Sequence, residues 1–228
     1  GIVHRLDRET SGVMILAKDQ KTYEHLKLQF QDHSIRKEYV AIVLGYMEPR
    51  GIINAPIGRN ARDIRIWTAG RGARGVLRDA VTRYVIQKKL IDKAGNKYSV
   101  VSLFPETGRT HQLRVHMKFT QHPIIGDGLY APKTVGMLGF NRVALHARKI
   151  TFKDIDNKEY TLDKDGNALG ENGTIFKTKD EIAVLNTPPT PPPPTSQEVE
   201  IDGKVYKIDD KGNAVNEDGT VFMDKIGI

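Results

Sequence analysis

Short runs of apolar and β-branched residues recur along the first two thirds of the chain, and each is about as long as a β-strand. They lie at residues 39–44, 80–86, 98–104 and 145–152, and a continuous apolar run at 13–17 is of the same kind. Val, Ile and Tyr are frequent in strands because branched and aromatic side chains pack well on a pleated surface. The pattern predicts strands at all five places and a body dominated by β-structure.

Two helices are predicted between these strands. Asp19 is a suitable N-cap residue, and Tyr23, Leu26 and Phe30 recur at a spacing that places them on one helical face. A shorter helix is predicted after Thr110, whose hydroxyl can cap it. There Leu113 and Met117 lie one turn apart on the face expected to be buried, and Arg114 projects from the early part of the helix.

A segment rich in Gly and Arg, residues 58–75, is predicted to form a loop between strands. The sequence favours neither of two interpretations of its arginines: a solvated loop, or an arm that contacts RNA. The arginines in question are Arg59, Arg62, Arg65, Arg71 and Arg74.

Composition narrows the possible functions. The chain has 228 residues and no cysteine, which excludes disulfides, thiolate zinc sites and thiol nucleophiles. No apolar run approaches the roughly 20 residues that span a bilayer, and no signal-peptide pattern is present, so we expect a cytoplasmic protein without a membrane partner. Residues 1–155 carry a net charge of +14 and residues 156–228 a net charge of −7. A basic body attracts polyanions, and nucleic acid is therefore the leading class of partner.

The acidic tail contains an internal repeat. Residues 155–182 align without gaps with residues 201–228, sharing 14 of 28 positions, and a polyproline stretch lies between the copies. Proline fixes φ and removes backbone donors, so this stretch is expected to be an extended spacer. The tail is predicted to comprise a β-rich repeat at 154–186, a linker at 187–197 and a second repeat at 198–228. It would tether the chain to a protein partner.

A calcium loop at Asp163 is rejected on the residues. An EF-hand loop requires Gly at its sixth position and Glu at its twelfth, where this chain has Ala168 and Thr174. Hairpin turns built on Asp-Gly and Asn-Gly account for the same residues.

Two short motifs carry the candidate chemistry. The first is His-Arg-Leu-Asp-Arg-Glu-Thr-Ser-Gly at residues 4–12, and the second is Thr-Gly-Arg-Thr-His-Gln-Leu-Arg-Val-His at residues 107–116. Alone, the first is compatible with a surface ion pair and the second with the basic end of a capped helix. Together they are specific.

With these motifs the chain resembles the RluA/RluD-type RNA pseudouridine synthases, whose signature is His-Arg-Leu-Asp-x-x-Thr-Ser-Gly. Further stretches agree in the same order, at residues 37–41, 122–130 and 145–147. The resemblance covers about residues 1–153 and implies an α+β fold around a mainly antiparallel sheet. It also implies a catalytic domain that is N-terminally incomplete, because the family's Lys-Pro-containing strand segment does not precede the aspartate motif.

The resemblance implies roles for individual residues. Asp7 is the essential carboxylate of uridine isomerisation, either attacking C1′ or removing a sugar proton, and no cofactor is needed. Arg114 pairs with Asp7 and favours its charged form. Tyr39 stacks on the base and takes part in proton transfer, while Leu113 forms part of the pocket wall.

The implied RNA contacts lie in the same motifs. Arg5 would fill the space left when the target uridine is flipped out of the RNA. The other expected contacts, in rRNA or tRNA, are His4, Arg109, Thr110 and His111. A metal at His111 and His116 is rejected because no third ligand has a suitable spacing.

Two other functions are weighed against isomerisation. One is an inactive RNA-binding or structural protein that keeps the synthase fold and is tethered through its repeat tail; retention of Asp7, Tyr39 and Arg114 together argues against it. The other is a glycosidase, which needs a second acid at a set distance from Asp7, and only Glu9 is close in sequence.

Overall fold

The chain forms two compact units, residues 1–179 and residues 180–228. The structure, a computed structural model, describes residues 1–63, 65–70, 72–163, 165, 167–169, 173 and 175–177, together with four strands of the second unit. Within this described part, no helix is both long enough and apolar enough to cross a membrane.

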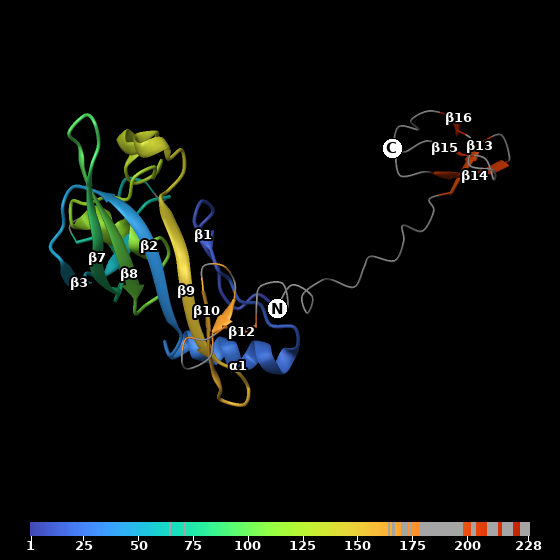
Figure 1. Cartoon of the computed structure of the whole chain (residues 1–228), viewed down its shortest axis with the longest axis horizontal. Helices are drawn as coiled ribbons and strands as arrows, with labels where there is room; N and C mark the ends of the chain where they lie inside the picture. The colour runs from blue at the N-terminus through green and yellow to red at the C-terminus, as the bar shows by residue number, and fades with distance from the viewer. Residues whose placement is uncertain are drawn as a thin grey trace. The chain divides into compact units, whose positions relative to one another are not determined.

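A long sheet organises the first unit (Figure 1). Its strands pair in the order β12-β11-β10-β9-β2-β8-β7-β3, all antiparallel, and β1 pairs with β9 in parallel. The bounds are β1 Ser11–Gly12, β2 Arg36–Leu44, β3 Arg50–Asn54, β7 Val81–Ile91, β8 Lys97–Pro105, β9 Leu145–Lys153, β10 Glu159–Leu162, β11 Ala168–Leu169 and β12 Ile175–Lys177. The predicted α+β fold and four of the five predicted strands are confirmed.

The described residues of this unit also form two α-helices and two 3-10 helices: α1 Gln20–Gln31, α2 Gln112–Phe119, and the 3-10 helices Pro132–Thr134 and Met137–Gly139. The N-cap prediction for α1 is confirmed, because Asp19 Oδ1 accepts the backbone N–H of Thr22 at 2.8 Å. Buried Leu26 packs α1 into a small core with Ile15, Ile35 and Ile150. The larger core holds α2 against the sheet through Leu113, Val115 and Met117.

The apolar run at 13–17 is not a strand, contrary to the sequence prediction. The chain leaves the sheet after β1. Val13 N–H still donates to the carbonyl of Ala147, and the end of the run forms an isolated bridge between Leu16 and Ile2, where Ala17 N–H donates to the carbonyl of Gly1 at 2.9 Å. The backbone N–H of Ile15 instead donates a hydrogen bond to His4 Nε2, at 3.0 Å. Ile15 and Ala17 are buried by packing rather than by strand pairing.

The arginine-rich segment is not simply a loop. It forms a separate three-stranded antiparallel sheet in the order β5-β4-β6, with bounds β4 Ile57–Asn60, β5 Trp67–Ala69 and β6 Ala73–Arg78. The guanidinium of Arg59 lies 4.3 Å from the ring centroid of Trp67. These strands were not predicted because they are short and rich in glycine and arginine. They show no clear alternation of apolar and polar residues.

The first repeat copy continues the main sheet. Its strands β10, β11 and β12 add to the edge of β9, where Tyr160 pairs with Phe152. The compact unit therefore ends near residue 179, whereas the sequence analysis placed a boundary after residue 153. The predicted hairpin turn is present: Asp163 Oδ1 accepts the backbone N–H groups of Asp165 and Asn167.

The second copy has the same strand pattern in the second unit. Its sheet runs β13-β14-β15-β16, with bounds β13 Glu198–Ile201, β14 Lys204–Ile208, β15 Ala214–Val215 and β16 Val221–Met223. Thr161 pairs with Leu169 in the first copy, and Lys207 pairs with Val215, each 46 residues later, in the second. The two copies, identical at half of their aligned positions, therefore have the same strand register. The predicted linker lies outside the described residues.

Candidate active site

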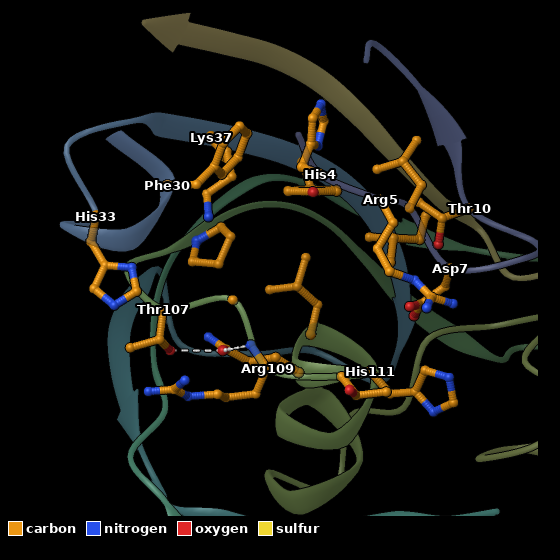
Figure 2. Close-up of a pocket in the computed structure, with 18 of the residues that line it drawn as sticks. His4, Arg5, Asp7, Thr10, Phe30, His33, Lys37, Thr107, Arg109 and His111 are labelled. Carbon is orange, nitrogen blue, oxygen red and sulfur yellow. Dashed lines mark hydrogen bonds between the residues drawn. The ribbon is translucent and has the colours of Figure 1, made fainter. Parts of the chain in front are cut away.

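A cleft of roughly 660 Å³ lies where three separate segments meet (Figure 2). They are residues 3–10 with the first motif, residues 30–39 at the junction of α1 and β2, and residues 105–113 leading into α2. All nine residues predicted for the site are in or beside this cleft: eight line it, and Arg114 contacts Asp7 from behind.

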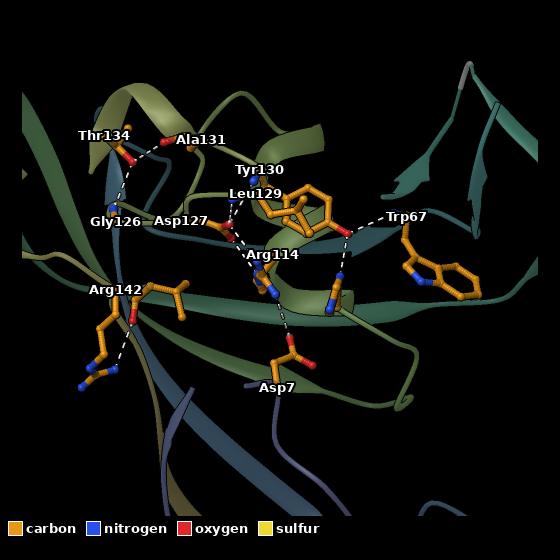
Figure 3. Close-up of polar contacts among 12 residues, drawn as sticks. Asp7, Trp67, Arg114, Gly126, Asp127, Leu129, Tyr130, Ala131, Thr134 and Arg142 are labelled. Carbon is orange, nitrogen blue, oxygen red and sulfur yellow. Dashed lines mark hydrogen bonds and ion pairs between the residues drawn. The ribbon is translucent and has the colours of Figure 1, made fainter. Parts of the chain in front are cut away.

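Arg114 connects two carboxylates (Figure 3). Its Nη1 lies 3.5 Å from Asp7 Oδ2, and its Nε and Nη2 donate to the two oxygens of Asp127 at 2.7 and 2.8 Å. Arg114 and Asp127 side chains are 8% and 1% exposed, whereas that of Asp7 is 23% exposed and faces the cleft. Burial is the largest single influence on the pKa of Arg114 and lowers it, but the hydrogen bonds to Asp127 together with the negative charges of Asp127 and Asp7 raise this pKa on balance. Arg114 is therefore a fixed cation that presents one free side to Asp7.

Asp127 is itself held firmly. Its Oδ1 also accepts the backbone N–H groups of Leu129 and Tyr130, at 3.0 and 2.9 Å. A carboxylate with four hydrogen bonds and no exposed surface can orient Arg114 without competition from water. Gly126 allows this turn, because its φ is +71° and a Cβ there would overlap the carbonyl of Arg142.

The loop that carries Asp7 is pinned to β9. Gly12 has φ +124°, and a Cβ at this position would overlap the backbone of Ala147, so the parallel contact of β1 requires glycine. Ser11 Oγ lies 3.0 Å from Nδ1 of His146 and accepts a hydrogen bond from Arg142 at 3.1 Å. These contacts give a physical reason for the Ser-Gly that closes the first motif.

Tyr39 reaches the cleft from β2, where it pairs with Leu103 of β8. Burial, and then the negative charge of Asp7, raise the pKa of Tyr39 to about 12. The hydroxyl is consequently neutral near pH 7 and is available as a proton donor. Its aromatic ring offers a surface on which a base can stack.

The start of α2 differs from the prediction. Thr110 is exposed and does not cap the helix; the N-cap residue is His111, with φ +56° and no side-chain cap bond. Gln112, the first residue of the helix, stabilises the turn before α2. Its Oε1 accepts hydrogen bonds from the N–H of Arg109 at 3.0 Å and from the hydroxyl of Thr107 at 2.7 Å. The first residue of the helix therefore connects α2 to the turn that precedes it.

His111 lies between the cleft and a buried tyrosine. Its Nδ1 is 2.8 Å from the hydroxyl of Tyr130, which accepts the backbone N–H of Trp67 at 3.0 Å. Burial lowers the pKa of His111, although Asp7 opposes this shift. Tyr130 therefore joins α2 to the arginine-rich sheet and also lies against Arg114, whose guanidinium is 4.9 Å from the ring centroid.

The remaining predicted residues have different surroundings. Arg5 is exposed beside Asp7 at the cleft, and Leu113, 7% exposed, forms part of its wall. His4 stacks on Phe30 with ring centroids 4.8 Å apart and accepts the N–H of Ile15. Burial, and then Lys37, lower the pKa of His4 to about 4, so its ring is neutral near pH 7 and is already engaged by the protein.

Sequence reasoning did not identify three residues that build the site: Asp127, Tyr130 and Gln112. The first two lie in the stretch 122–130, where the resemblance to the family implies no role for individual side chains. The available signal was a carboxylate in an otherwise apolar turn, Ile-Ile-Gly-Asp, since a carboxylate in such a context needs a buried partner.

Comparisons with known proteins agree with this geometry. The family model described as RNA pseudouridylate synthase matches residues 1–119. An uncharacterized RNA pseudouridine synthase of Bacillus subtilis is 37% identical over 70% of this chain and 50% of its own length. The ribosomal large subunit pseudouridine synthase D of Zymomonas mobilis is 38% identical over 72% of this chain and 51% of its own.

A solved structure is also similar. The human RNA pseudouridylate synthase domain containing 1 superposes with a TM-score of 0.62 at 30% identity, over 68% of this chain and 64% of that one. The chain spans about half the length of the curated relatives it matches.

Proposed function

Because this chain belongs to the RNA pseudouridylate synthase family, we propose that it isomerises uridine to pseudouridine in structured RNA, with Asp7 as the essential carboxylate. One observation carries the proposal: Asp7 faces a cleft beside an arginine fixed by a second, buried carboxylate, and Tyr39 lines the same cleft. A protein that only bound RNA would not need this arrangement. The inactive alternative finds no support in it.

The reaction exchanges one bond of the ribose for another. The bond from C1′ to N1 of uracil breaks, the base turns, and a bond from C1′ to C5 forms; the hydrogen of C5 is lost and N1 gains a proton. Asp7 would either attack C1′ or remove a sugar proton. Tyr39, neutral because its pKa is raised, would stack on the base and take part in the proton transfer at C5. The chemistry requires no cofactor.

The substrate would be rRNA or tRNA, flipped at the target uridine. Arg5 is exposed at the mouth of the cleft beside Asp7, where it could fill the space that the uridine leaves. Arg109, Thr110 and His111 line the same cleft and would contact the RNA. The cost of unstacking, a few kcal/mol, would be offset by contacts between the basic body and the phosphates.

Two finer points complete the proposal. The acidic second unit, 180–228, would tether the enzyme to a protein partner, because its charge opposes RNA binding. The protein would act in the cytoplasm, where it would meet rRNA or tRNA; fractionation of cells with an antibody to the chain tests this location.

The experiment that tests the function is tritium release from RNA that carries 5-tritiated uridine. The parent chain should release tritium, and Asp7→Asn should release none above background. Glu9→Gln is the matched control, since it neutralises an exposed carboxylate two residues away and should keep the parent rate. Release by Asp7→Asn at the parent rate would contradict the proposed role of Asp7.

A further inference from the structure

The end of the cleft away from Asp7 contains a lysine that the isomerisation does not use. Lys37 lies on β2 two residues before Tyr39, and both side chains line the cleft. Figure 2 shows Lys37 beside Phe30 and near His33, across the cleft from Arg5 and Asp7. Because a strand advances about 3.3 Å per residue, the Cα atoms of Lys37 and Tyr39 are about 7 Å apart.

Lys37 has no counter-charge among the residues that the structure describes. In the part of the chain that the structure describes, its ammonium makes no ion pair and no hydrogen bond, and it lies 6.0 Å from the ring centroid of Phe30. The side chain is nonetheless mostly buried, and burial lowers its pKa. A partly buried cation without a partner destabilises the protein. A bound anion would remove that cost.

The space above this ammonium is open. Gly108 faces it, and a Cβ on Gly108 would lie 3.9 Å from Lys37 Nζ, so that any larger side chain would begin to fill the space. Arg109 lines the same part of the cleft, with its Nε donating to the carbonyl of Asp79 at 2.9 Å. Exposed His33 lies at the rim. Within the lining of the whole cleft, Asp7 is the single carboxylate.

We propose that Lys37, with Gly108 and Arg109, forms a subsite for a backbone phosphate of the substrate RNA. Because Lys37 and Tyr39 are two residues apart on β2 and both line the cleft, that phosphate would belong to a nucleotide next to the one held at Tyr39. The inference rests on the proposed function for the identity of the polyanion. It assigns the far end of the cleft to holding the strand, while the Asp7 end performs the chemistry.

The test compares binding of a short fluorescein-labelled oligouridylate by anisotropy at several KCl concentrations. Lys37→Met removes the charge and keeps the aliphatic chain, and Lys149→Met is the matched control, because Lys149 is exposed on β9 and does not line the cleft. Loss of a charge-assisted phosphate contact should weaken binding roughly tenfold at low salt. The slope of log K against log salt should fall by about 0.7, the value for one phosphate of a single strand. The control should change neither value.

Stability provides a second readout. Since Lys37 is an unpaired cation, Lys37→Met should leave the melting temperature unchanged or raise it, as expected of a residue kept for binding. Gly108→Leu keeps the charge but covers it, and should weaken binding to a similar extent.

Three results would overturn the subsite. They are a parent chain that binds no oligouridylate, an unchanged salt slope in Lys37→Met, and a lowered melting temperature, which would indicate a structural role. Because binding is measured without turnover, a chain that fails to release tritium but shows the slope change would refute the isomerase function and leave the phosphate subsite intact.

Discussion

The charged residues at the two ends of the cleft differ in whether they are paired with an opposite charge. At one end Asp7, Arg114 and Asp127 form a continuous chain of paired charges, buried more deeply with distance from the cleft. At the other end Lys37 is held without any counter-charge in the described residues. The difference indicates that the protein orients Asp7 and Arg114 before substrate binds, as catalysis requires. It leaves Lys37 without a partner in the described residues, because the proposed partner is a phosphate of the substrate.

The largest expected effect concerns the two carboxylates that share Arg114. Asp127→Ala leaves the arginine buried without its bidentate partner and should lower the free energy of unfolding by about 3–5 kcal/mol. Asp7→Ala should change it by less than about 1 kcal/mol, because the Asp7 contact is 3.5 Å long and partly exposed. Urea unfolding of both variants measures the difference. Equal losses would show that the two partners of Arg114 are equivalent, and the comparison would fail.

Sequence could predict the cleft end and the middle of this chain of charges, Asp7 and Arg114, but not its buried end, Asp127. Asp7, Arg114 and Tyr39 belong to motifs whose spacing is visible in the chain, and the strand pattern that carries Tyr39 is plain. Asp127 is recognisable only once Arg114 is known to be buried, because its function depends on packing between segments far apart in the sequence.

Local rules also failed where tertiary contacts outweighed them. The apolar run 13–17 has the composition of a strand, yet the N–H of Ile15 is satisfied by His4, a side chain. Thr110 is a better cap residue than His111 by preference. However, Gln112 already satisfies the N–H of Arg109, and Thr107 bonds to the same oxygen.

A second prediction concerns Tyr39, at the boundary between the two ends. Tyr39→Phe keeps the stacking surface and removes the hydroxyl, and should lower the rate of tritium release by about a hundredfold if the hydroxyl transfers a proton. Because the pKa of Tyr39 is about 12, the parent rate should show no loss from its ionisation between pH 6 and pH 10. Rates measured across this range in both proteins test the assignment. A rate for Tyr39→Phe equal to that of the parent would restrict Tyr39 to stacking.

A third prediction concerns His4, which lines the cleft. Its ring stacks on Phe30 and accepts a hydrogen bond from the N–H of Ile15. Its pKa is about 4 in the folded chain against an ordinary value of 6.5, so the unfolded chain binds more protons between these values. Stability should therefore fall as the pH is lowered from 6.5 to 4, by on the order of 2 kcal/mol after allowance for partial exposure. His4→Gln keeps a hydrogen-bond acceptor but does not titrate, so the variant should lack this contribution to the pH dependence of stability. Parallel slopes for the two proteins would exclude His4 as its source.

The smallest effect is expected from removing residues 180–228. The first repeat copy already completes the edge of the main sheet with β10, β11 and β12, and the second copy forms its own four-stranded sheet with matching register. Neither end of the cleft is built from residues beyond Leu145. The truncated chain should keep its free energy of unfolding within about 0.5 kcal/mol, since no named source of destabilisation is touched, and should release tritium from free RNA at the parent rate. Thermal unfolding and tritium release measure both quantities. A slower rate on free RNA would mean that the second unit contributes to catalysis. The two ends of the cleft would then not account for the activity by themselves.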